Sequence, residues 1–328
     1  MIEAPATILI VIPCLNEEAH LAKLVNSLLQ SNPAETSRIV IADGGSTDST
    51  PQIATELARQ HPHIFYLHNP KKLQAAAVNL AAQTYGEGAK YLIRIDAHAD
   101  YPADYCQRLI EEALSTEADA VVVAMQTVGI TPFQRAVAAA QNSKLGNGGS
   151  SHRSEGKSGK WVDHGHHALM RLTAFNAVGG YDECFSHNED AELDYRLKQG
   201  GYTIWLTNRT SLVYYPRSSP WRLFRQYVGY GSGRARTFLK HHMRPKLRQI
   251  IPSVVVPSMV LALATPLTAW AIFPLMLWMI ICLSYGFLLA RRTEDKTIAM
   301  AGPAAMLMHA GWSLGFWITV TKVWLKRS

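Results

Sequence analysis

The chain of 328 residues has a net charge of +7, but the charges are unevenly distributed. Residues 1–194 hold 14 Lys and Arg against 23 Asp and Glu, a net charge of −9, whereas residues 195–249 hold 12 basic residues and no acidic one. The overall basic balance is therefore a poor argument for nucleic-acid binding. The four cysteines lack the paired spacing of zinc or redox sites, which favours free thiols and a cytosolic location of the part that carries most of them.

The first part of the chain alternates short apolar runs with helical segments. The β-branched runs predict strands at residues 7–12, 38–42, 64–68, 91–95 and 120–124. Helices are predicted at residues 17–30, from Pro51 onward, at 73–83 and at 104–115, with Asn16 capping the first and Thr50 the second. Such alternation predicts an α/β fold with a mainly parallel sheet that helices cover on both sides.

Polar side chains follow three of these strands at the point where each strand ends. They are Asn16 with Glu17, the turn 43–48, and Asp96 with His98. Alone, each of these is as often an ordinary cap or turn former as a ligand. Ligands of open parallel sheets bind at the carboxyl edge, where all three groups fall, so their shared position favours a binding site. A carboxylate and an imidazole two residues apart are also a plausible pair for a divalent cation.

The segment after residue 124 is richer in glycine and histidine. Residues 146–160 contain five Gly and four Ser, which predicts a mobile loop that can act as a lid. His164, His166 and His167 follow, with a spacing too irregular to indicate a metal cluster. Asn188 is expected to cap a helix over residues 189–198, which Gly200 and Gly201 end.

Two long apolar segments close the chain. Residues 250–290 carry no charge, and residues 297–321 have only His309 as an ionisable side chain, so both exceed the roughly 20 residues that cross a bilayer. The first segment predicts a helical hairpin around Pro274, and the second an interfacial or re-entrant helix, since a third crossing would place Lys322 outside. The basic block before them favours anionic lipid headgroups over nucleic acid. We therefore expect a catalytic domain over 1–246 and membrane helices over 247–328.

The polar clusters together resemble a known family. The runs at residues 11–18, 43–48, 96–98 and 188–190, in this order and spacing, are similar to the inverting glycosyltransferases of family 2, which have the GT-A nucleotide-sugar-binding fold. The membrane tail and residues 227–236 look most like the bacterial exopolysaccharide enzymes of succinoglycan type. The resemblance implies an enzyme at the inner (plasma) membrane, with a cytoplasmic catalytic domain, that adds one hexose from a nucleotide sugar, UDP-glucose as the expected donor, to a lipid-linked saccharide.

The resemblance also assigns roles to individual residues. Pro13, Asn16 and Glu17 would line the nucleotide pocket, Asp43 would bind the base or ribose, and Asn79 would lie near the diphosphate. Asp96 and His98 match the metal-binding pair of the family, with His where the family has a second Asp, and imply Mn²⁺ or Mg²⁺. Asp190 matches the catalytic base. Glu189 beside it would point elsewhere on the helix, and becomes the alternative base if Asp190 proves dispensable.

Other functions stay open at this point. A dinucleotide-dependent oxidoreductase is disfavoured because Pro13 and not a Gly-x-Gly-x-x-Gly run follows the first strand. A polyprenyl-phosphate glycosyltransferase and a non-catalytic membrane scaffold with a degenerate nucleotide-sugar site remain alternatives. Gln226 is not followed by the Gln-x-x-Arg-Trp pattern of processive family members, which favours a single addition.

Overall fold

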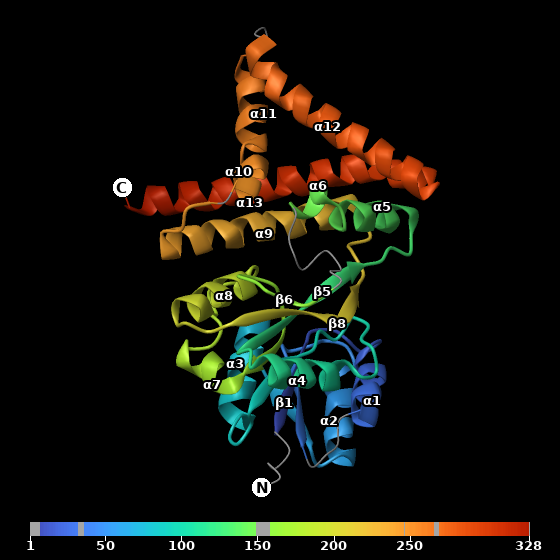
Figure 1. Ribbon diagram of the computed structural model, residues 1–328, viewed down its shortest axis with the longest axis vertical. Coiled ribbons are helices and arrows are strands. Elements are labelled where there is room, and N and C mark those ends of the chain that lie inside the picture. Colours follow the sequence, from blue (N-terminus) through green and yellow to red (C-terminus); the bar gives the residue numbers. More distant parts are fainter. Residues whose placement is uncertain (1–6, 32–35, 149–157, 246, 266–268, 328) are drawn as a thin grey trace. The chain divides into compact units, whose positions relative to one another are not determined.

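A computed structural model describes residues 7–31, 36–148, 158–245, 247–265 and 269–327 (Figure 1). The chain forms two compact units, of which the first comprises residues 1–125 and 155–212 and the second residues 126–154 and 213–328. The predicted loop at 146–160 lies mostly outside the described residues. The predicted boundary between residues 246 and 247 rests on the change from charged to apolar sequence. The two compact units divide the chain at other positions and do not test this boundary, which stays a prediction.

Among the described residues, all the strands lie before residue 215. They are β1 (Ile8–Cys14), β2 (Ser37–Asp43), β3 (Ile64–His68), β4 (Tyr91–Arg94), β5 (Ala120–Thr127), β6 (Lys160–Trp161), β7 (His166–Arg171) and β8 (Ile204–Tyr214). The helices of the first unit are α1 (Leu21–Ser31), α2 (Thr50–Gln60), α3 (Gln74–Tyr85), α4 (Tyr105–Thr116), α7 (Leu172–Ala177) and α8 (Glu189–Gln199).

One sheet joins the strands in the order β3-β2-β1-β4-β7-β5-β8-β6. The strands β3, β2, β1 and β4 are parallel, with Ile10 beside both Ile39 and Ile93, so the predicted α/β fold with a mainly parallel sheet is confirmed. Strand β7 pairs antiparallel with β4 and with β5. Because β7 runs against β4, its first residues lie beyond the carboxyl end of β4, next to the predicted site.

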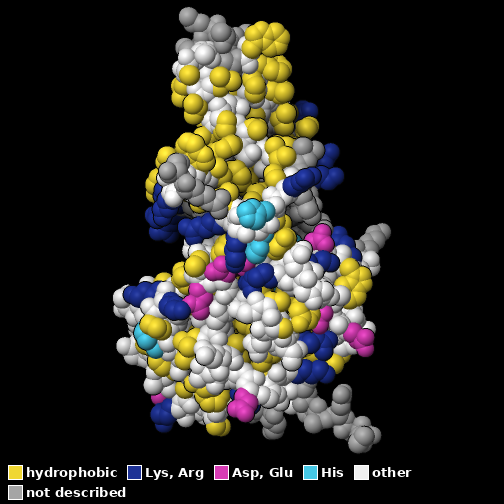
Figure 2. All heavy atoms as spheres, turned by 90° about the vertical axis from the view of Figure 1, so that its left-hand side faces the viewer, with side chains coloured by type: hydrophobic (Ala, Val, Ile, Leu, Met, Phe, Trp, Pro, Cys, Tyr) yellow, Lys and Arg dark blue, Asp and Glu magenta, His cyan; other side chains and the backbone are white. Residues whose placement is uncertain are grey.

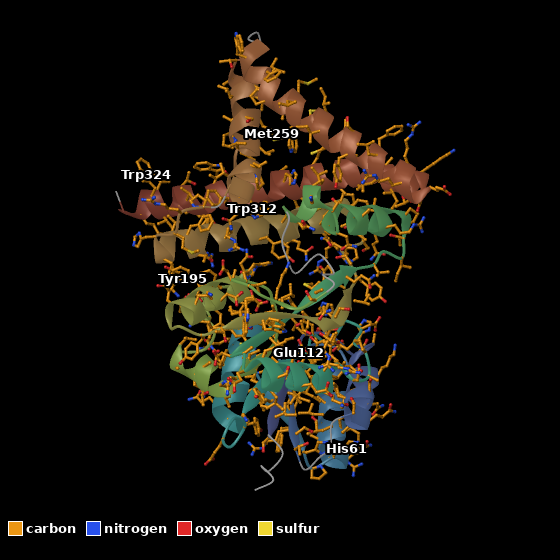
Figure 3. The ribbon with its side chains drawn as sticks, in the orientation of Figure 1. His61, Glu112, Tyr195, Met259, Trp312 and Trp324 are labelled. Atoms are coloured by element: carbon orange, nitrogen blue, oxygen red, sulfur yellow. The ribbon has the colours of Figure 1, made fainter. Side chains whose placement is uncertain are left out.

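The core of the first unit is apolar on both faces of the sheet. Leu9, Ile10, Val11 and Ile12 are all fully buried, as expected for a parallel strand covered on both sides. Among the buried acids, Glu112 lies under the strand β8. Glu112 of α4, labelled in Figure 3, accepts a hydrogen bond from Trp205 Nε1 at 2.6 Å.

Two predicted helix caps are wrong. Asn16 has a φ of 57° and its side chain accepts a hydrogen bond from Thr47 N, so it caps no helix and α1 begins at Leu21 instead of residue 17. Thr50 is the first residue of α2, and Ser49 takes the cap position. In both cases the side chain is used by a contact between loops, which local sequence does not reveal.

The second unit is helical apart from the strand ends that enter it. Its helices are α5 (Pro132–Gln141), α6 (Lys144–Asn147), α9 (Pro220–His241), α10 (Leu247–Ser253), α11 (Val255–Ala264), α12 (Ala269–Thr293) and α13 (Ala301–Arg327), with the 3₁₀ helix η2 (Lys296–Met300). Figure 1 shows α9 and α13 side by side along most of their length, and these two helices pack closely.

Small residues bring α9 and α13 together. A Cβ on Gly231 of α9 would lie 1.9 Å from the carbonyl oxygen of Trp312, a residue labelled in Figure 3, and a Cβ on Gly315 of α13 would lie 2.0 Å from that of Val228. Ser232 also donates a hydrogen bond to the Gly315 carbonyl at 3.1 Å. The glycines therefore let the two backbones approach as closely as small residues do in membrane helix pairs.

We expect Gly231→Ala to destabilise the second unit by about 1–3 kcal/mol, although alanine in a helix interior normally gains about 1 kcal/mol over glycine. The reason is that the methyl group of alanine would overlap the backbone carbonyl oxygen of Trp312. Thermal unfolding in detergent measures the effect, with Arg225→Ala, at an exposed position of the same helix, as the control. Equal unfolding midpoints for the two variants would contradict the close crossing.

Helices α11 and α12 leave their apolar side chains exposed. Figure 2 shows hydrophobic side chains gathered at this end of the second unit, where Leu263 is 82% and Trp270 89% exposed. Residues 272–293 of α12 are long and apolar enough to cross a membrane, the one such helix among the described residues, and 249–264 form a shorter apolar helix. The predicted hairpin at Pro274 is wrong, because Pro274 lies inside α12 and α11 ends at Ala264.

Candidate active site

The loops after β1 and β2 are joined by hydrogen bonds at the carboxyl edge of the sheet. Asn16 Oδ1 accepts from Thr47 N at 2.8 Å, and Asn16 N donates to Ser46 Oγ at 2.8 Å. Glu18 and Asp48 add a reciprocal pair, in which each carboxylate accepts from the backbone of the other loop. The structure thus brings the predicted pocket residues of both loops together and holds their backbones in a fixed relation.

Asp43 ends β2 and is almost completely buried. Its carboxylate accepts hydrogen bonds from Gly45 N, Ser46 N and Ser46 Oγ, and from Tyr66 Oη of β3 at 3.3 Å. Gly45 has a φ of 78°, which favours glycine in this turn. Asp43 therefore shapes the turn between β2 and α2, and its role toward a base or ribose stays a prediction.

Glu17 and His98 come from different loops and meet at the same edge. His98 Nδ1 lies 2.8 Å from Glu17 Oε1, and the His98 side chain is 53% exposed. Pro13 lies inside β1 beside Ala42 of β2, one residue before the end of the strand. The structure therefore joins the predicted metal residue His98 to the predicted nucleotide residue Glu17.

Asp96 follows β4 and is partly accessible. Its Oδ1 accepts a hydrogen bond from Gln74 Nε2 at 2.8 Å, while Oδ2 lies 3.7 Å from His166 Nε2. No group of three or more His, Cys, Asp or Glu side chains suited to a metal ion occurs among the described residues. Asp96 is a partly accessible carboxylate, but the His98 imidazole is paired with Glu17, so the metal-binding pair of Asp96 and His98 stays a prediction.

A buried ion pair lies beside Asp96. The Arg94 side chain, 2% exposed, donates from Nη1 to Asp190 Oδ1 at 2.6 Å and from Nη2 to Asp190 Oδ2 at 3.1 Å. Tyr181 Oη also donates to Asp190 Oδ1, at 2.9 Å. Burial alone would raise the pKa of Asp190, but the charges of Arg94 and then His167 outweigh it and lower that pKa well below its usual range. Asp190 is therefore held as an anion by a bidentate partner.

The turn that carries Tyr181 is fixed from two sides. Asn79 of α3 donates to the Tyr181 carbonyl and accepts from Tyr181 N, both at 2.8 Å, and it also donates to Glu183. Gly180 has a φ of 67°, and a Cβ there would lie 2.6 Å from Asn79 Oδ1. Arg196 of α8 donates to the Gly180 carbonyl. Asn79 thus positions this turn, while its predicted place near a diphosphate stays a prediction.

His164 precedes β7, His166 and His167 begin it, and among the described residues all three lie beside acids and form no metal cluster. Asp194 of α8 is buried, with His164 Nδ1 at 2.6 Å from one oxygen and His167 Nε2 at 2.7 Å from the other. Burial lowers the pKa of His167, but Asp194 outweighs this and raises it. His166 instead faces Arg94, and burial and then the positive charge of Arg94 lower its pKa to about 4. His166 is therefore neutral at pH 7 and accepts from Arg94.

Sequence reasoning did not find Arg94, Tyr181 or Asp194. Arg94 lies inside the run that predicts β4, where a lone charge with apolar neighbours is itself a signal of a buried ion pair. Its partner Asp190 follows 96 residues later, so no local pattern connects them. In the sequence alone, Tyr181 has the pattern of an ordinary turn residue, and Asp194 that of an ordinary residue inside a helix.

Comparison with known proteins extends this picture. The model described as Glycosyl transferase family 2 matches residues 9–179. The succinoglycan biosynthesis protein ExoA of Rhizobium meliloti is 57% identical over 309 residues, which cover 94% of this chain and 93% of that protein. The Methanococcus voltae enzyme dolichyl N-acetyl-alpha-D-glucosaminyl phosphate 3-beta-D-2,3-diacetamido-2,3-dideoxy-beta-D-glucuronosyltransferase is 25% identical, covering 69% of this chain and 72% of its own length.

A solved structure has the same fold. The mannosyltransferase PcManGT from Pyrobaculum calidifontis, in complex with GDP-Man and Mn²⁺, superposes with a TM-score of 0.62 at 16% identity, covering 98% of this chain and 88% of its own. The predicted GT-A fold is confirmed, with its loops meeting at the carboxyl edge of a mainly parallel sheet. The chain is a glycosyltransferase and belongs to family 2.

Proposed function

We propose that the enzyme transfers one hexose from a nucleotide diphosphate sugar to a lipid-linked saccharide in exopolysaccharide synthesis, with UDP-glucose as donor. The observation that carries this proposal is the identity of 57% to a succinoglycan biosynthesis protein over nearly the whole chain. The archaeal relative, whose name specifies a dolichyl phosphate sugar, supports a lipid-linked acceptor. The missing Gln-x-x-Arg-Trp pattern after Gln226 supports a single addition.

The chemistry follows from the edge at which the loops meet. The turn around Asp43, with Pro13, Asn16 and Glu17, would receive the nucleotide. The acceptor hydroxyl attacks the anomeric carbon opposite the leaving diphosphate, so the configuration at that carbon inverts. Asp190, in the first turn of α8, would take the hydroxyl proton. General-base catalysis of this kind typically raises the rate by about 10²–10⁴-fold.

A divalent cation, Mn²⁺ or Mg²⁺, would be held by Asp96 and His98 together with the donor diphosphate. It supplies a positive charge that offsets the negative charge developing on the leaving group. The residues support this role in part, because Asp96 is a partly accessible carboxylate at the strand edge and His98 exposes its imidazole.

We expect Asp96→Ala to remove the dependence of donor affinity on the divalent cation. Calorimetric titration of the nucleoside diphosphate with and without Mn²⁺ measures the effect. The parent should bind more tightly with the metal, whereas the variant should bind equally weakly in both conditions. Glu56→Gln, on the exposed side of α2, serves as the control and should keep the metal dependence. Tight donor binding by the parent in excess chelator would contradict the metal role.

The apolar exposed helices α11 and α12 support attachment to the inner (plasma) membrane. Basic residues at the end of α12, Arg291 and Arg292, favour a return of the chain to the cytoplasm. We expect protease added to intact cells to leave residues 1–246 uncut, and protease added to inverted vesicles to digest them. Cleavage of this part from outside intact cells would reverse the orientation.

A panel of nucleotide sugars tests the proposed transfer. Purified enzyme in detergent, with extracted membrane lipids as acceptors, should transfer radiolabel from UDP-glucose in preference to other donors. Label on a polyprenyl phosphate without a pre-existing saccharide would favour a polyprenyl-phosphate glycosyltransferase. Nucleotide binding without transfer from any donor would favour a non-catalytic scaffold.

A further inference from the structure

The junction between α10 and α11 is held by side chains of α13. Ser313 Oγ donates to the Ser253 carbonyl at 2.8 Å and accepts from Val256 N at 3.0 Å. Trp317 Nε1 also donates to the Ser253 carbonyl, at 2.7 Å. Pro257 explains the junction, because it has no N–H to offer the carbonyl four residues before it. The backbone groups that the helix break leaves open are therefore satisfied by α13, as an apolar environment requires.

The second half of α12 is fixed to the same helix. Trp278 Nε1 donates to His309 Nδ1 at 3.2 Å. Further along α12, a Cβ on Gly302 of α13 would lie 2.6 Å from the Cys282 carbonyl oxygen, and a Cβ on Gly286 would lie 2.5 Å from Gly302 N. Figure 1 shows α11 and α12 as the two legs of one hairpin. Both legs are thus attached to α13.

The part of the hairpin between these attachments is short. It comprises residues 257–264 of α11 and 269–277 of α12. At about 1.5 Å per residue, the two legs rise by about 12 and 14 Å at most. The hydrocarbon core of a bilayer is about 30 Å thick, so legs that start at one interface end near its middle. Residues 272–293 are long enough to cross a membrane, but α13 holds their second half.

The side chains of the two legs suit lipid tails. Residues 250–290 contain no charge. Four large apolar side chains of the legs are 60% to 89% exposed, namely Val260, Leu263, Trp270 and Phe273. Exposed arginines flank the segment, with Arg244 before it and Arg291 after it. Because cations favour the cytoplasmic side, both ends of the hairpin are expected on that side.

The end of α13 has one exposed apolar face. Thr321, Trp324 and Leu325 follow Trp317 at helical spacing. Trp324, labelled in Figure 3, and Leu325 are each 67% exposed. Two exposed cations border this face, Lys322 and Lys326. An apolar face with tryptophan and a lysine border is typical of a helix that lies in the plane of the membrane interface.

This face of α13 points to the same side as the hairpin. Trp317 belongs to the face and bonds the Ser253 carbonyl at the start of the hairpin. Gly315, which meets the backbone of α9, lies about 160° around the helix from Trp317. Helix α13 therefore has α9 on one side, and the hairpin with the exposed apolar face on the other.

We propose that α11 and α12 form a re-entrant hairpin that enters the cytoplasmic leaflet of the membrane and returns on the same side, with the apolar face of α13 in the interface. The inference rests on the proposed attachment to the inner membrane and states how the chain is attached. The surface that the hairpin fits is a single phospholipid leaflet. Among the described residues, no helix then crosses the bilayer.

Cysteine labelling tests whether the hairpin crosses. Leu263→Cys and Trp270→Cys, one on each leg, would be made in a chain that carries Cys184→Ser, because Cys184 is the exposed native thiol. A membrane-impermeant maleimide should label neither new cysteine in intact cells or in inverted vesicles, and should add one label to each variant after denaturation in SDS. Glu56→Cys, on the exposed surface of α2, is the control and should be labelled in inverted vesicles but not in intact cells.

Fluorescence quenching measures the depth of each element. Purified Leu263→Cys and Leu325→Cys, labelled with bimane, would be reconstituted in vesicles of phosphatidylcholine and phosphatidylglycerol with bromine at different depths in the acyl chains. Bimane at position 263 should be quenched most by bromine deep in the chains, and bimane at position 325 by bromine near the headgroups. Both side chains are exposed, so the unfolding midpoints should match that of the parent.

The possible outcomes separate this inference from the proposed attachment. Labelling of Leu263→Cys or Trp270→Cys from outside intact cells would show a crossing and overturn the re-entrant hairpin, while membrane attachment and sugar transfer would stand. Labelling of either variant in inverted vesicles, or quenching at position 263 no deeper than at position 325, would show a hairpin outside the leaflet and would also overturn it. A parent chain found in the soluble fraction would overturn the attachment and this inference with it.

Discussion

Arg94→Met is expected to destabilise the first unit by about 3–5 kcal/mol, because it leaves the Asp190 carboxylate buried without its partner. Asp190 would keep the hydrogen bond from Tyr181 and a neutral His166 at 3.6 Å, neither of which replaces the adjacent charge of Arg94. Denaturant unfolding in detergent measures the loss of unfolding free energy. Hydrogen exchange of peptides from β4 and α8 then shows whether the loss of stability arises in these two elements.

A double-mutant cycle isolates the pair. Asp190→Asn alone should also destabilise the unit, and Arg94→Met combined with Asp190→Asn should cost less than the sum of the single changes, because the two partners interact. Arg59→Met, which breaks the ion pair with Glu56 on the exposed surface of α2, is the matched control and should change little. Equal effects of Arg94→Met and Arg59→Met would contradict the buried pair.

Asp194→Ala is expected to destabilise the first unit by about 3–5 kcal/mol at pH 5.5, because it removes the counter-charge of the fully buried His167. The effect should depend on pH. The pKa of His167 is raised by Asp194, so the pair contributes fully below the unfolded value of about 6.5, and its contribution falls as pH rises through the folded value. Because the pKa of Asp194 is lowered, its carboxylate stays charged down to acid solution. It loses that charge only as pH falls below about 3.9.

The expected result is therefore a larger difference between parent and Asp194→Ala at pH 5.5 than at pH 8.5. Unfolding midpoints at both pH values measure it. Asp163→Ala, at an exposed acid near the same turn, is the control and should show no such dependence. A difference that grows with rising pH would mean that His167 is neutral and that the contact with Asp194 is an uncharged hydrogen bond.

The sequence predicted the parallel half of the sheet well, because each of its strands is a short apolar run bounded by turn residues. Residues 64–68 form a strand with the predicted limits. The antiparallel β7 between β4 and β5 was not predicted, since pairing across the sheet leaves no mark in the hydrophobic pattern of His166–Arg171. The sequence predicts the turn of a helical hairpin at Pro274, yet this proline lies inside α12. Prolines are tolerated inside apolar membrane-type helices, so the residue alone does not mark a helix end.

The candidate site was predicted by position and less well by role. Asn16, Asp43, Asp96 and His98 do lie at the carboxyl edge, because parallel strands place their ends there. What each side chain does depends on partners far away in the chain. Asn16 bonds a loop 31 residues on, and Asp190 is held by an arginine 96 residues before it. Such contacts follow from the fold and not from local spacing.

The structure of the product tests the central claim most directly. Enzyme, UDP-glucose and lipid-linked saccharides extracted from membranes would be incubated, and the product analysed by mass spectrometry and by NMR of the new anomeric carbon. We predict a lipid-linked saccharide heavier by one hexose, with the anomeric configuration opposite to that of the donor. A product that retains the donor configuration, or several hexoses added in one encounter, would contradict a single inverting transfer.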